Sequence, residues 1–348
     1  MKVGILTASR TDNNGTDLQA LAMQKIFEKV NGQSIIINYK CDKLENSRKI
    51  FYPLSFRGFL NIPYQLCSHI QHENFRKKYF KYSQHIYNSD DIRYAKFDYL
   101  VVGSDQVWNL EITGNDINFF LPFETESCKI SYAVSLGVLD ISDWNREYNL
   151  KSMLNDFKGV SVRELSGVEV LKKIGIEAVC NLDPLLMIKS TEWNQIITRH
   201  KNRKPYIFVY TVDRTYEILR EAKELAKEMK CTVIFYGNLF RHISGVRVKR
   251  FSGIEEWLDL VKNAELVITN SYHGLSFAIN FHKKFSVYWL TNSPQSNTRI
   301  KSLLSQIDVQ DYEEGMICNP KWEKVERNLD KMRNKSFQYI KEMLSIND

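Results

Sequence analysis

The stretch with the clearest potential for chemistry is Thr269–Gly274, which reads TNSYHG and follows the apolar run Leu266–Ile268. That run has the length and β-branched content of a buried strand, and an apolar helical pattern follows the turn. In α/β proteins such a turn is the usual place for a ligand, and the helix start offers free amides to an anion. His273 could therefore act on a bound anion. The alternative is a helix capped by Ser271, with the histidine facing solvent.

Two further polar turns follow strand-like runs in the first half of the chain. Gly103–Asn109, which reads GSDQVWN, places Asp105 where a strand delivers side chains to a ligand. Gly159–Val162 delivers Arg163, whose planar guanidinium binds phosphate or carboxylate through two parallel hydrogen bonds. The alternatives are a helix N-cap for Asp105 and, for Arg163, an ion pair with Glu164 or an ion pair between the lobes.

The elements that must position these groups alternate between strand and helix. Lys2–Ala8 predicts a strand, Thr16–Gln19 is a capping-box pattern that opens a helix, and Ser34–Tyr39 predicts the next strand. This order is typical of the parallel βαβ unit of a Rossmann-like domain. The first loop holds a single glycine and so lacks the dinucleotide fingerprint, which argues against a nicotinamide cofactor.

The alternation of strands and helices is interrupted by the insert at 41–96 and then resumes. Ile130–Ser135 predicts another strand, and Pro205–Tyr210 opens a second series that ends in a long charged helix. We therefore predict two domains: residues 1–190, with a helical and aromatic insert at 41–96, and residues 191–348, whose last helix can return to the first lobe.

The insert at 41–96 contains both aromatic and basic side chains. Its aromatic residues interleave with basic ones: Phe51, Tyr52, Phe56, Phe59, Tyr64, Phe75, Tyr79, Phe80 and Tyr82 with Arg76, Lys77, Lys78 and Lys81. The favoured interpretation is a helical excursion that packs its rings on the core. Nucleic-acid binding, contact with an anionic membrane and a platform for sugar rings are the alternatives.

Composition restricts the class of protein. The 348 residues carry 48 basic and 41 acidic side chains, a net charge of +7 that suits anionic substrates. Six scattered cysteines without a CxxC pair indicate reduced thiols. No apolar run approaches the roughly 20 residues of a membrane span. We expect a cytoplasmic protein, with peripheral contact at the inner face of the plasma membrane as a further hypothesis.

Taken together, the motifs resemble the polysaccharide pyruvyltransferase family. The resemblance covers nearly the whole chain in one order and depends most on two specific elements, GSDQVWN at 103–109 and TNSYHG at 269–274. Weaker support comes from shorter motifs: Asn13–Gly15, Leu18–Ala20, Ser131–Ser135, Ser161–Glu164, Asp183-Pro184 with Trp193, and Asn297–Arg299. Some relatives have an Arg-x-His-Gly pattern, whereas this chain has Ser271 in place of the arginine.

The resemblance implies two Rossmann-like lobes with parallel sheets, arranged as in glycosyltransferases of the B type with an active-site cleft between them. It implies transfer of the enolpyruvyl carbons of phosphoenolpyruvate to sugar hydroxyls as a cyclic ketal, in surface polysaccharide biosynthesis. Asp105 and His273 are the catalytic candidates. Donor binding is expected from Arg163, Arg299, Asn270, Ser271 and Gly274. Acceptor or cleft positions are Asn14, Gly15, Ser104, Gln106, Trp108 and Ser135.

The expected partners are phosphoenolpyruvate as co-substrate and a saccharide acceptor, lipid-linked in one version of the hypothesis. No nucleic acid, separate cofactor or metal ion is expected, since neither an HxxxH nor a paired-carboxylate motif is present. Two other readings stay open: a glycosyltransferase with a nucleotide-sugar donor on the same fold, and a non-catalytic carbohydrate-binding protein.

Overall fold

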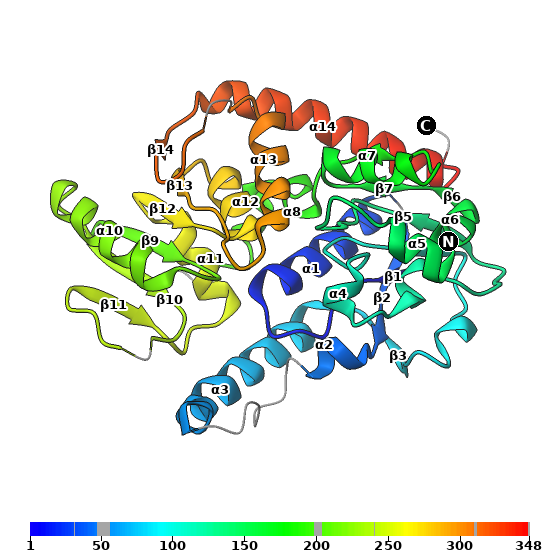
Figure 1. Cartoon of the computed structure of the whole chain (residues 1–348), viewed down its shortest axis with the longest axis horizontal. Helices are drawn as coiled ribbons and strands as arrows, with labels where there is room; N and C mark the ends of the chain where they lie inside the picture. Colours follow the sequence, from blue (N-terminus) through cyan, green and yellow to red (C-terminus); the bar gives the residue numbers. More distant parts are fainter. Residues whose placement is uncertain (31, 47–55, 198–203, 240, 310–311, 347–348) are drawn as a thin grey trace. The chain divides into compact units, whose positions relative to one another are not determined.

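The computed structural model describes two compact units (Figure 1). It covers residues 1–30, 32–46, 56–197, 204–239, 241–309 and 312–346, without the side chains of 46 and 56–61. Unit 1 comprises Met1–Lys49, Arg76–Ile188 and Leu329–Asp348, and unit 2 comprises Ile50–Phe75 and Lys189–Asn328. Each unit has its own sheet and core. The cleft expected between the two lobes stays a prediction.

Unit 1 is built on a six-stranded sheet in the order β3-β2-β1-β4-β5-β6. Every neighbouring pair is parallel. The strands are β1 (Lys2–Leu6), β2 (Gln33–Tyr39), β3 (Tyr82–Tyr87), β4 (Tyr99–Val102), β5 (Cys128–Ser131) and β6 (Phe157–Gly159). The central strands are apolar runs because both faces of a parallel sheet are covered. This strand order is the doubly wound order of dinucleotide-binding domains, and it confirms a Rossmann-like first lobe.

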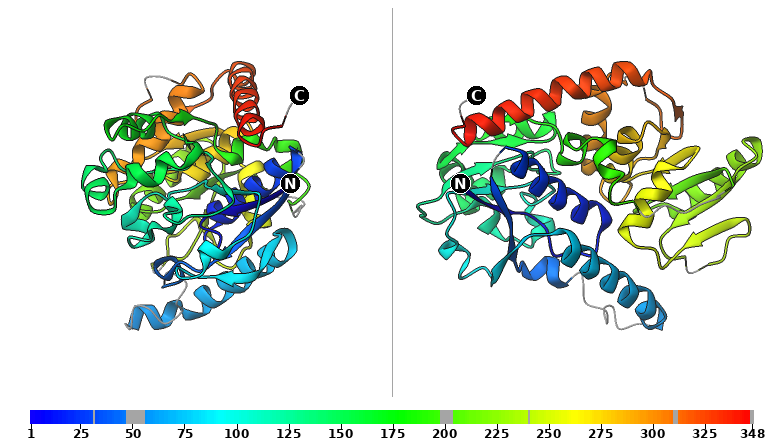
Figure 2. Two further views of the ribbon diagram at one scale, coloured as in Figure 1. Left: turned by 90° about the vertical axis from the view of Figure 1, so that its right-hand side faces the viewer. Right: turned by 180° about the vertical axis from the view of Figure 1, so that it is seen from behind.

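Helices and short elements complete unit 1. They are α1 (Asn14–Lys29), α2 (Asp42–Asn46), η1 (Ile92–Tyr94), α4 (Leu110–Thr113), η2 (Ile117–Phe120), α5 (Ser142–Tyr148), α6 (Leu150–Asn155), α7 (Leu165–Lys173), α8 (Pro184–Met187) and the small parallel pair β7 (Ser161–Val162) and β8 (Val179–Cys180). Helix α1 lies along one face of β1 and β2, and α8 packs against it (Figure 2). Trp108, Phe119 and Phe120 lie in the unit's main apolar core.

Unit 2 repeats the plan with strands in the order β11-β10-β9-β12-β13-β14. Four pairs are parallel, and the last strand is antiparallel to β13. The strands are β9 (Tyr206–Tyr210), β10 (Thr232–Tyr236), β11 (Val246–Lys249), β12 (Leu266–Thr269), β13 (Lys284–Val287) and β14 (Ile317–Cys318). The five parallel strands have the same relative order as in unit 1, which confirms the second Rossmann-like lobe.

The helices of unit 2 are α9 (Ser190–Trp193), α10 (Thr215–Glu228), α11 (Ile254–Lys262), α12 (Tyr272–Asn280), η3 (Pro294–Ser296) and α13 (Asn297–Gln306). The Phe277 ring on α12 contacts the rings of Trp193 and Trp257 edge-on, with centroids 5.2 and 5.4 Å apart. Every residue of α12 is buried. Because α12 is packed on all sides, polar His273, Ser276 and Asn280 included, it is a rigid support for the turn before it.

Two helices contribute to both units. Helix α3 (Phe56–Tyr79) contacts Phe251 within unit 2, since the Gln71 side chain donates to the Phe251 carbonyl at 2.8 Å. The prediction had placed the whole insert in the first lobe. Phe51 and Tyr52 lie outside the described residues, and the side chains of Phe56 and Phe59 are not described. Helix α14 (Trp322–Met343) stacks Trp322 on His282 in unit 2, and its Arg333 donates to the Leu186 carbonyl in unit 1.

Some predicted boundaries were wrong for identifiable reasons. The strand expected at Ile130–Ser135 ends at Ser131, because Ala133 has a left-handed φ of 47° and interrupts the ladder. The helix expected to open with Thr16 begins at Asn14, since Asn13 is the N-cap and accepts from Gly15 N and Thr16 N. Among the described helices, none is both long enough and apolar enough to cross a bilayer.

Candidate functional site

In each unit the predicted site residues follow the carboxyl ends of strands: β1, β4, β5 and β7 in unit 1, and β12 and β13 in unit 2. In unit 1, β1 and β4 are neighbours, and the strand order reverses between them. In unit 2 the same reversal falls between β9 and β12. Ligands of doubly wound folds bind at this reversal. The structure therefore gives two candidate half-sites, one in each unit.

Asp105 is the central residue of the half-site in unit 1. It has a left-handed φ of 74° and follows a cis peptide bond between Gly103 and Ser104. Its Oδ2 accepts from the Thr16 hydroxyl at 3.0 Å, and its Oδ1 accepts from Gln106 N at 2.9 Å. The side chain keeps about 12% of its surface exposed. The carboxylate is thus fixed in orientation but still open to a ligand.

Arg163 does not present a free guanidinium, as a donor clamp would. Its side chain is 0% exposed, and Nη1 donates to Asp183 at 2.9 Å. Nη2 lies 3.4 Å from Asp105 Oδ1, and Nε lies 3.7 Å from Glu164 Oε2. Three carboxylates around one guanidinium leave an excess of negative charge, which disfavours a phosphate at this point. The ion-pair alternative fits this geometry, and the donor-binding role predicted for Arg163 does not.

The loop after β5 is also fixed by a carboxylate. Glu164 Oε1 accepts from the Ser135 hydroxyl at 2.9 Å, from Leu136 N at 3.0 Å and from Gly137 N at 3.3 Å. Ser135 therefore supports the loop, and so does Ser104, whose hydroxyl donates to the Ala133 carbonyl at 2.6 Å. Both are fully buried, and their roles at the acceptor or cleft stay predictions.

Other predicted acceptor positions divide between core and turn. Trp108 is fully buried, donates to the Phe119 carbonyl at 2.8 Å and stacks on Phe120, so it belongs to the core. The Gln106 side chain lies against Gly137, where a Cβ would come within 2.0 Å of its Oε1. Asn14 and Gly15 lie in the buried first turn of α1, where their roles as acceptor contacts stay predictions.

The half-site in unit 2 is organised by Asp213 and Asn270. The Asn270 amide donates to Asp213 Oδ1 at 2.6 Å, and its oxygen accepts from Val212 N at 2.7 Å. Asp213 Oδ2 accepts from Thr291 N, the Thr291 hydroxyl and Asn292 N at 2.9–3.2 Å. This network joins the loops after β9, β12 and β13. The amide of Asn270 is committed to it, so we assign Asn270 to loop positioning.

Ser271 and Gly274 shape the start of α12. Ser271 is the N-cap, and its hydroxyl accepts from Gly274 N at 3.4 Å. A Cβ on Gly274 would lie 2.5 Å from Thr269 Oγ1 and 3.2 Å from the Tyr210 ring, so glycine lets α12 approach β12 and β9 closely. Burial raises the pKa of Tyr210 well above its usual range, which keeps its phenol protonated. The capping alternative for Ser271 is confirmed.

His273 and Arg299 each lie close to the ring of Tyr272. The Tyr272 and His273 ring centroids are 5.8 Å apart, and the Arg299 guanidinium lies 5.8 Å from the Tyr272 centroid. Arg299 Nε donates to the Ser296 carbonyl at 3.1 Å, which fixes the side chain on the first turn of α13. His273 is mostly buried rather than solvent-facing. The tertiary structure thus brings together an imidazole and a cation that are separated by 26 positions in sequence.

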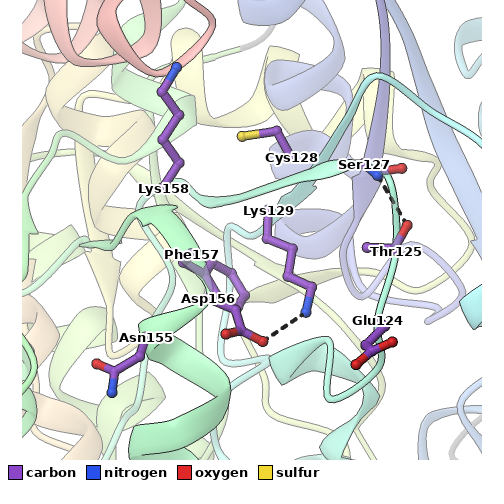
Figure 3. Close-up of a pocket in the computed structure, with 9 residues that line it drawn as sticks. All are labelled: Glu124, Thr125, Ser127, Cys128, Lys129, Asn155, Asp156, Phe157 and Lys158. Carbon is purple, nitrogen blue, oxygen red and sulfur yellow. Dashed lines mark hydrogen bonds and ion pairs between the residues drawn. The ribbon is translucent and has the colours of Figure 1, made fainter.

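A separate cavity of about 700 Å³ opens in unit 1 at the amino end of β5 (Figure 3). It is lined by Glu124, Thr125, Ser127, Cys128, Lys129, Asn155, Asp156, Phe157 and Lys158. Lys129 Nζ points toward Asp156 Oδ2 at 3.4 Å. The predicted residues of unit 1 follow the opposite, carboxyl ends of the strands. This cavity therefore contains none of the candidate site.

Sequence reasoning missed several positioning residues. Asp213 follows β9 in the same way that Asp105 follows β4, and this shared position after a strand was a usable signal. Thr16 was taken for a helix cap, although its hydroxyl binds Asp105. Asp183 was noted only for its proline, although it binds Arg163 and caps α8.

Two doubly wound units, each with polar turns at its strand reversal, define a two-domain α/β protein of the glycosyltransferase B kind. The family model for polysaccharide pyruvyl transferase matches residues 13–292, and the chain belongs to this family. A search among curated proteins found no significant match.

Solved structures agree on the fold. The UDP-GlcNAc 2-epimerase from Neisseria meningitidis bound to UDP-GlcNAc is 14% identical, with 100% of both chains covered and a TM-score of 0.51. The S. aureus MnaA–UDP co-structure is 10% identical, with 99% of this chain and 97% of that chain covered and a TM-score of 0.52. An α-glucosyltransferase in complex with UDP and a 13-mer DNA containing a HMU base is 11% identical, with 99% of both chains covered and a TM-score of 0.51. At these identities the likeness shows the fold alone.

Proposed function

We propose that this protein transfers the pyruvyl carbons of phosphoenolpyruvate to two hydroxyls of a saccharide, forming a cyclic ketal and releasing phosphate. Membership of the polysaccharide pyruvyl transferase family carries the proposal. The supporting structural observation is the grouping of His273, Tyr272 and Arg299 at the carboxyl end of a central strand in unit 2. An imidazole and a guanidinium are the groups that an anionic enol phosphate requires.

The reaction requires an acid first. A proton is added to C3 of the enol, which leaves an oxocarbenium-like centre at C2. One sugar hydroxyl forms a bond to C2 and loses its proton to a base, and the bond between C2 and the phosphate oxygen breaks. The second hydroxyl then forms a bond to the oxocarbenium centre that this leaves at C2, which closes the ketal, and its proton passes to the released phosphate. We assign the proton donation to His273, since a positioned acid contributes about 10²–10⁴-fold to the rate.

The donor is an anion, so it requires a cation. Arg299 is our candidate, because its side chain is already fixed by the Ser296 carbonyl and loses little freedom on binding. Ser271 stands where some relatives have an arginine, and the Arg163 guanidinium is surrounded by carboxylates. Neither position supplies a cation for the donor, and Arg299 is therefore the stronger candidate. Asp105 of unit 1 remains our candidate base for the attacking hydroxyl, held in orientation by Thr16 and Arg163.

Phosphate release from phosphoenolpyruvate, measured with a panel of lipid-linked and nucleotide-linked sugars, tests the proposal. The expected result is phosphate release that depends on the sugar, together with an acceptor that gains one pyruvyl ketal by mass spectrometry. His273→Gln should lower kcat by about 10²–10⁴-fold with little change in KM. Arg299→Met should raise the KM for phosphoenolpyruvate by about 10–100-fold, the worth of a hydrogen bond to a charged group.

The matched control is Arg247→Met, which removes an exposed arginine from β11 of the same unit. It should leave KM and kcat unchanged. Release of a nucleoside diphosphate without phosphoenolpyruvate would replace the proposal with a glycosyltransferase, a reading that the UDP-bound neighbours of the same fold make worth testing. Saccharide binding without either product would indicate a carbohydrate-binding protein.

A further inference from the structure

One face of helix α3 is exposed along its described length. The exposed positions recur every three or four residues, which places them on a single stripe: Pro63, Leu66, Ile70, Asn74 and Lys77. Leu66 and Ile70 are 45% and 50% exposed, which is unusual for two aliphatic side chains one turn apart. The stripe is apolar in the middle of the helix and becomes basic at its end, where Lys77 and Lys78 are both exposed.

A loop from elsewhere in unit 2 packs on the flank of α3 beside this stripe. Phe251 is 55% exposed and follows the exposed Arg250. Its carbonyl accepts from the Gln71 side chain at 2.8 Å, and its ring centroid lies 6.5 Å from that of Tyr64. Phe251 therefore contacts α3 at Tyr64 and Gln71, the residues that directly follow Pro63 and Ile70 of the stripe. We call this surface the α3 face, made of Pro63, Leu66, Ile70 and Phe251 with Lys77, Lys78 and Arg250.

We propose that the α3 face docks on an anionic lipid bilayer. Apolar side chains of an interfacial helix enter the boundary between headgroups and acyl chains, while neighbouring cations bind the headgroup phosphates. The α3 face supplies both, and the net charge of +7 favours the approach. A stable protein interface buries roughly 800 Å² on each partner. Three half-exposed side chains and a proline offer much less apolar surface, which favours a membrane over a second protein.

Co-sedimentation of the full chain with vesicles tests this inference independently of the proposed activity. Vesicles of phosphatidylcholine alone are compared with vesicles that contain phosphatidylglycerol as the anionic lipid. The protein should pellet with the anionic vesicles, and added salt should weaken the binding because the cations are exposed. Lys77→Gln and Lys78→Gln should each lower the partition coefficient by about fivefold.

The apolar part is tested by the triple variant Leu66→Ser, Ile70→Ser, Phe251→Ser, which should lower partitioning by about tenfold or more. The matched control is Ile86→Ser with Tyr94→Ser, which changes two side chains of unit 1 that are 52% and 64% exposed. The control should bind vesicles like the parent. An unchanged thermal melting profile shows that both variants are folded.

Three results would overturn the inference. The first is a parent protein that stays in solution with anionic vesicles, and the second is a triple variant that binds them as well as the parent. The third is a parent that sediments as a dimer while the triple variant sediments as a monomer, which would assign the α3 face to a second copy of the chain.

Discussion

Replacing Arg163 with methionine tests whether this residue stabilises unit 1 through its ion pairs or binds the donor. Methionine fills much of the same volume but leaves Asp105, Glu164 and Asp183 in a buried cluster without their counter-charge. Removing one partner of a buried ion pair destabilises a protein by about 3–5 kcal/mol. We expect a loss of that size, confined to unit 1, since each of the three carboxylates belongs to that unit.

Hydrogen–deuterium exchange followed by mass spectrometry locates the effect. Two domains need not unfold together, so a single melting temperature would not separate them. Amides of β4, β5 and β7 should exchange about 10²–10³·⁵-fold faster in the variant, which is the expected loss converted at about 1.4 kcal/mol per factor of ten. Peptides from β9 and β12 should be unchanged. Arg93→Met, which removes an exposed arginine of the same unit, is the control.

A second substitution sharpens the test. Asp183→Asn removes one stranded charge while keeping an oxygen that can cap α8. The Arg163→Met, Asp183→Asn double variant should therefore lose less stability than the sum of the single variants. The reasoning is refuted if Arg163→Met exchanges like the parent in unit 1 and only the KM for phosphoenolpyruvate rises. That outcome would return Arg163 to the donor site.

Three further predictions concern packing, loop anchoring and thiol chemistry. Gly274→Ala should destabilise unit 2 by about 1–3 kcal/mol in urea unfolding, because its Cβ would meet Thr269 and Tyr210; an unchanged urea midpoint would contradict this close packing. Asp213→Ala should speed hydrogen exchange at residues 291–292 and leave unit 1 unchanged, since the carboxylate accepts three hydrogen bonds from those residues. Burial raises the pKa of Cys41 to about 12, so this thiol should resist iodoacetamide at pH 8 in the folded protein. It should react in urea, and mass spectrometry measures both reactions. Rapid labelling of Cys41 in the folded chain would contradict its burial.

The sequence alone determined the class of fold. Apolar runs of strand length that alternate with helical patterns specify parallel βαβ units. A strand that is covered on both faces of a sheet must itself be an almost continuous apolar run, so each strand can be recognised from its own residues. It also located the turns that carry Asp105 and His273, since polar residues directly after a buried strand stand out against their neighbours. It missed β3 and β14, which are edge strands with little apolar pattern, and it extended the strand at Ile130 to Ser135, although the strand ends at Ser131.

Only the tertiary structure decided what each polar side chain does. Arg163 and Arg299 were both predicted from the sequence to bind the donor. In the structure the Arg163 guanidinium is surrounded by three carboxylates, whereas the Arg299 guanidinium lies over the Tyr272 ring. Glu164 is the neighbour of Arg163 in sequence and was predicted as a partner, but Asp105 and Asp183 come from two other segments, and no local pattern records that they converge on Arg163. Charge pairing depends on distances of a few ångströms between segments far apart in the chain. For that reason the sequence could name the ionisable groups, and the fold alone could assign them to structure or to chemistry.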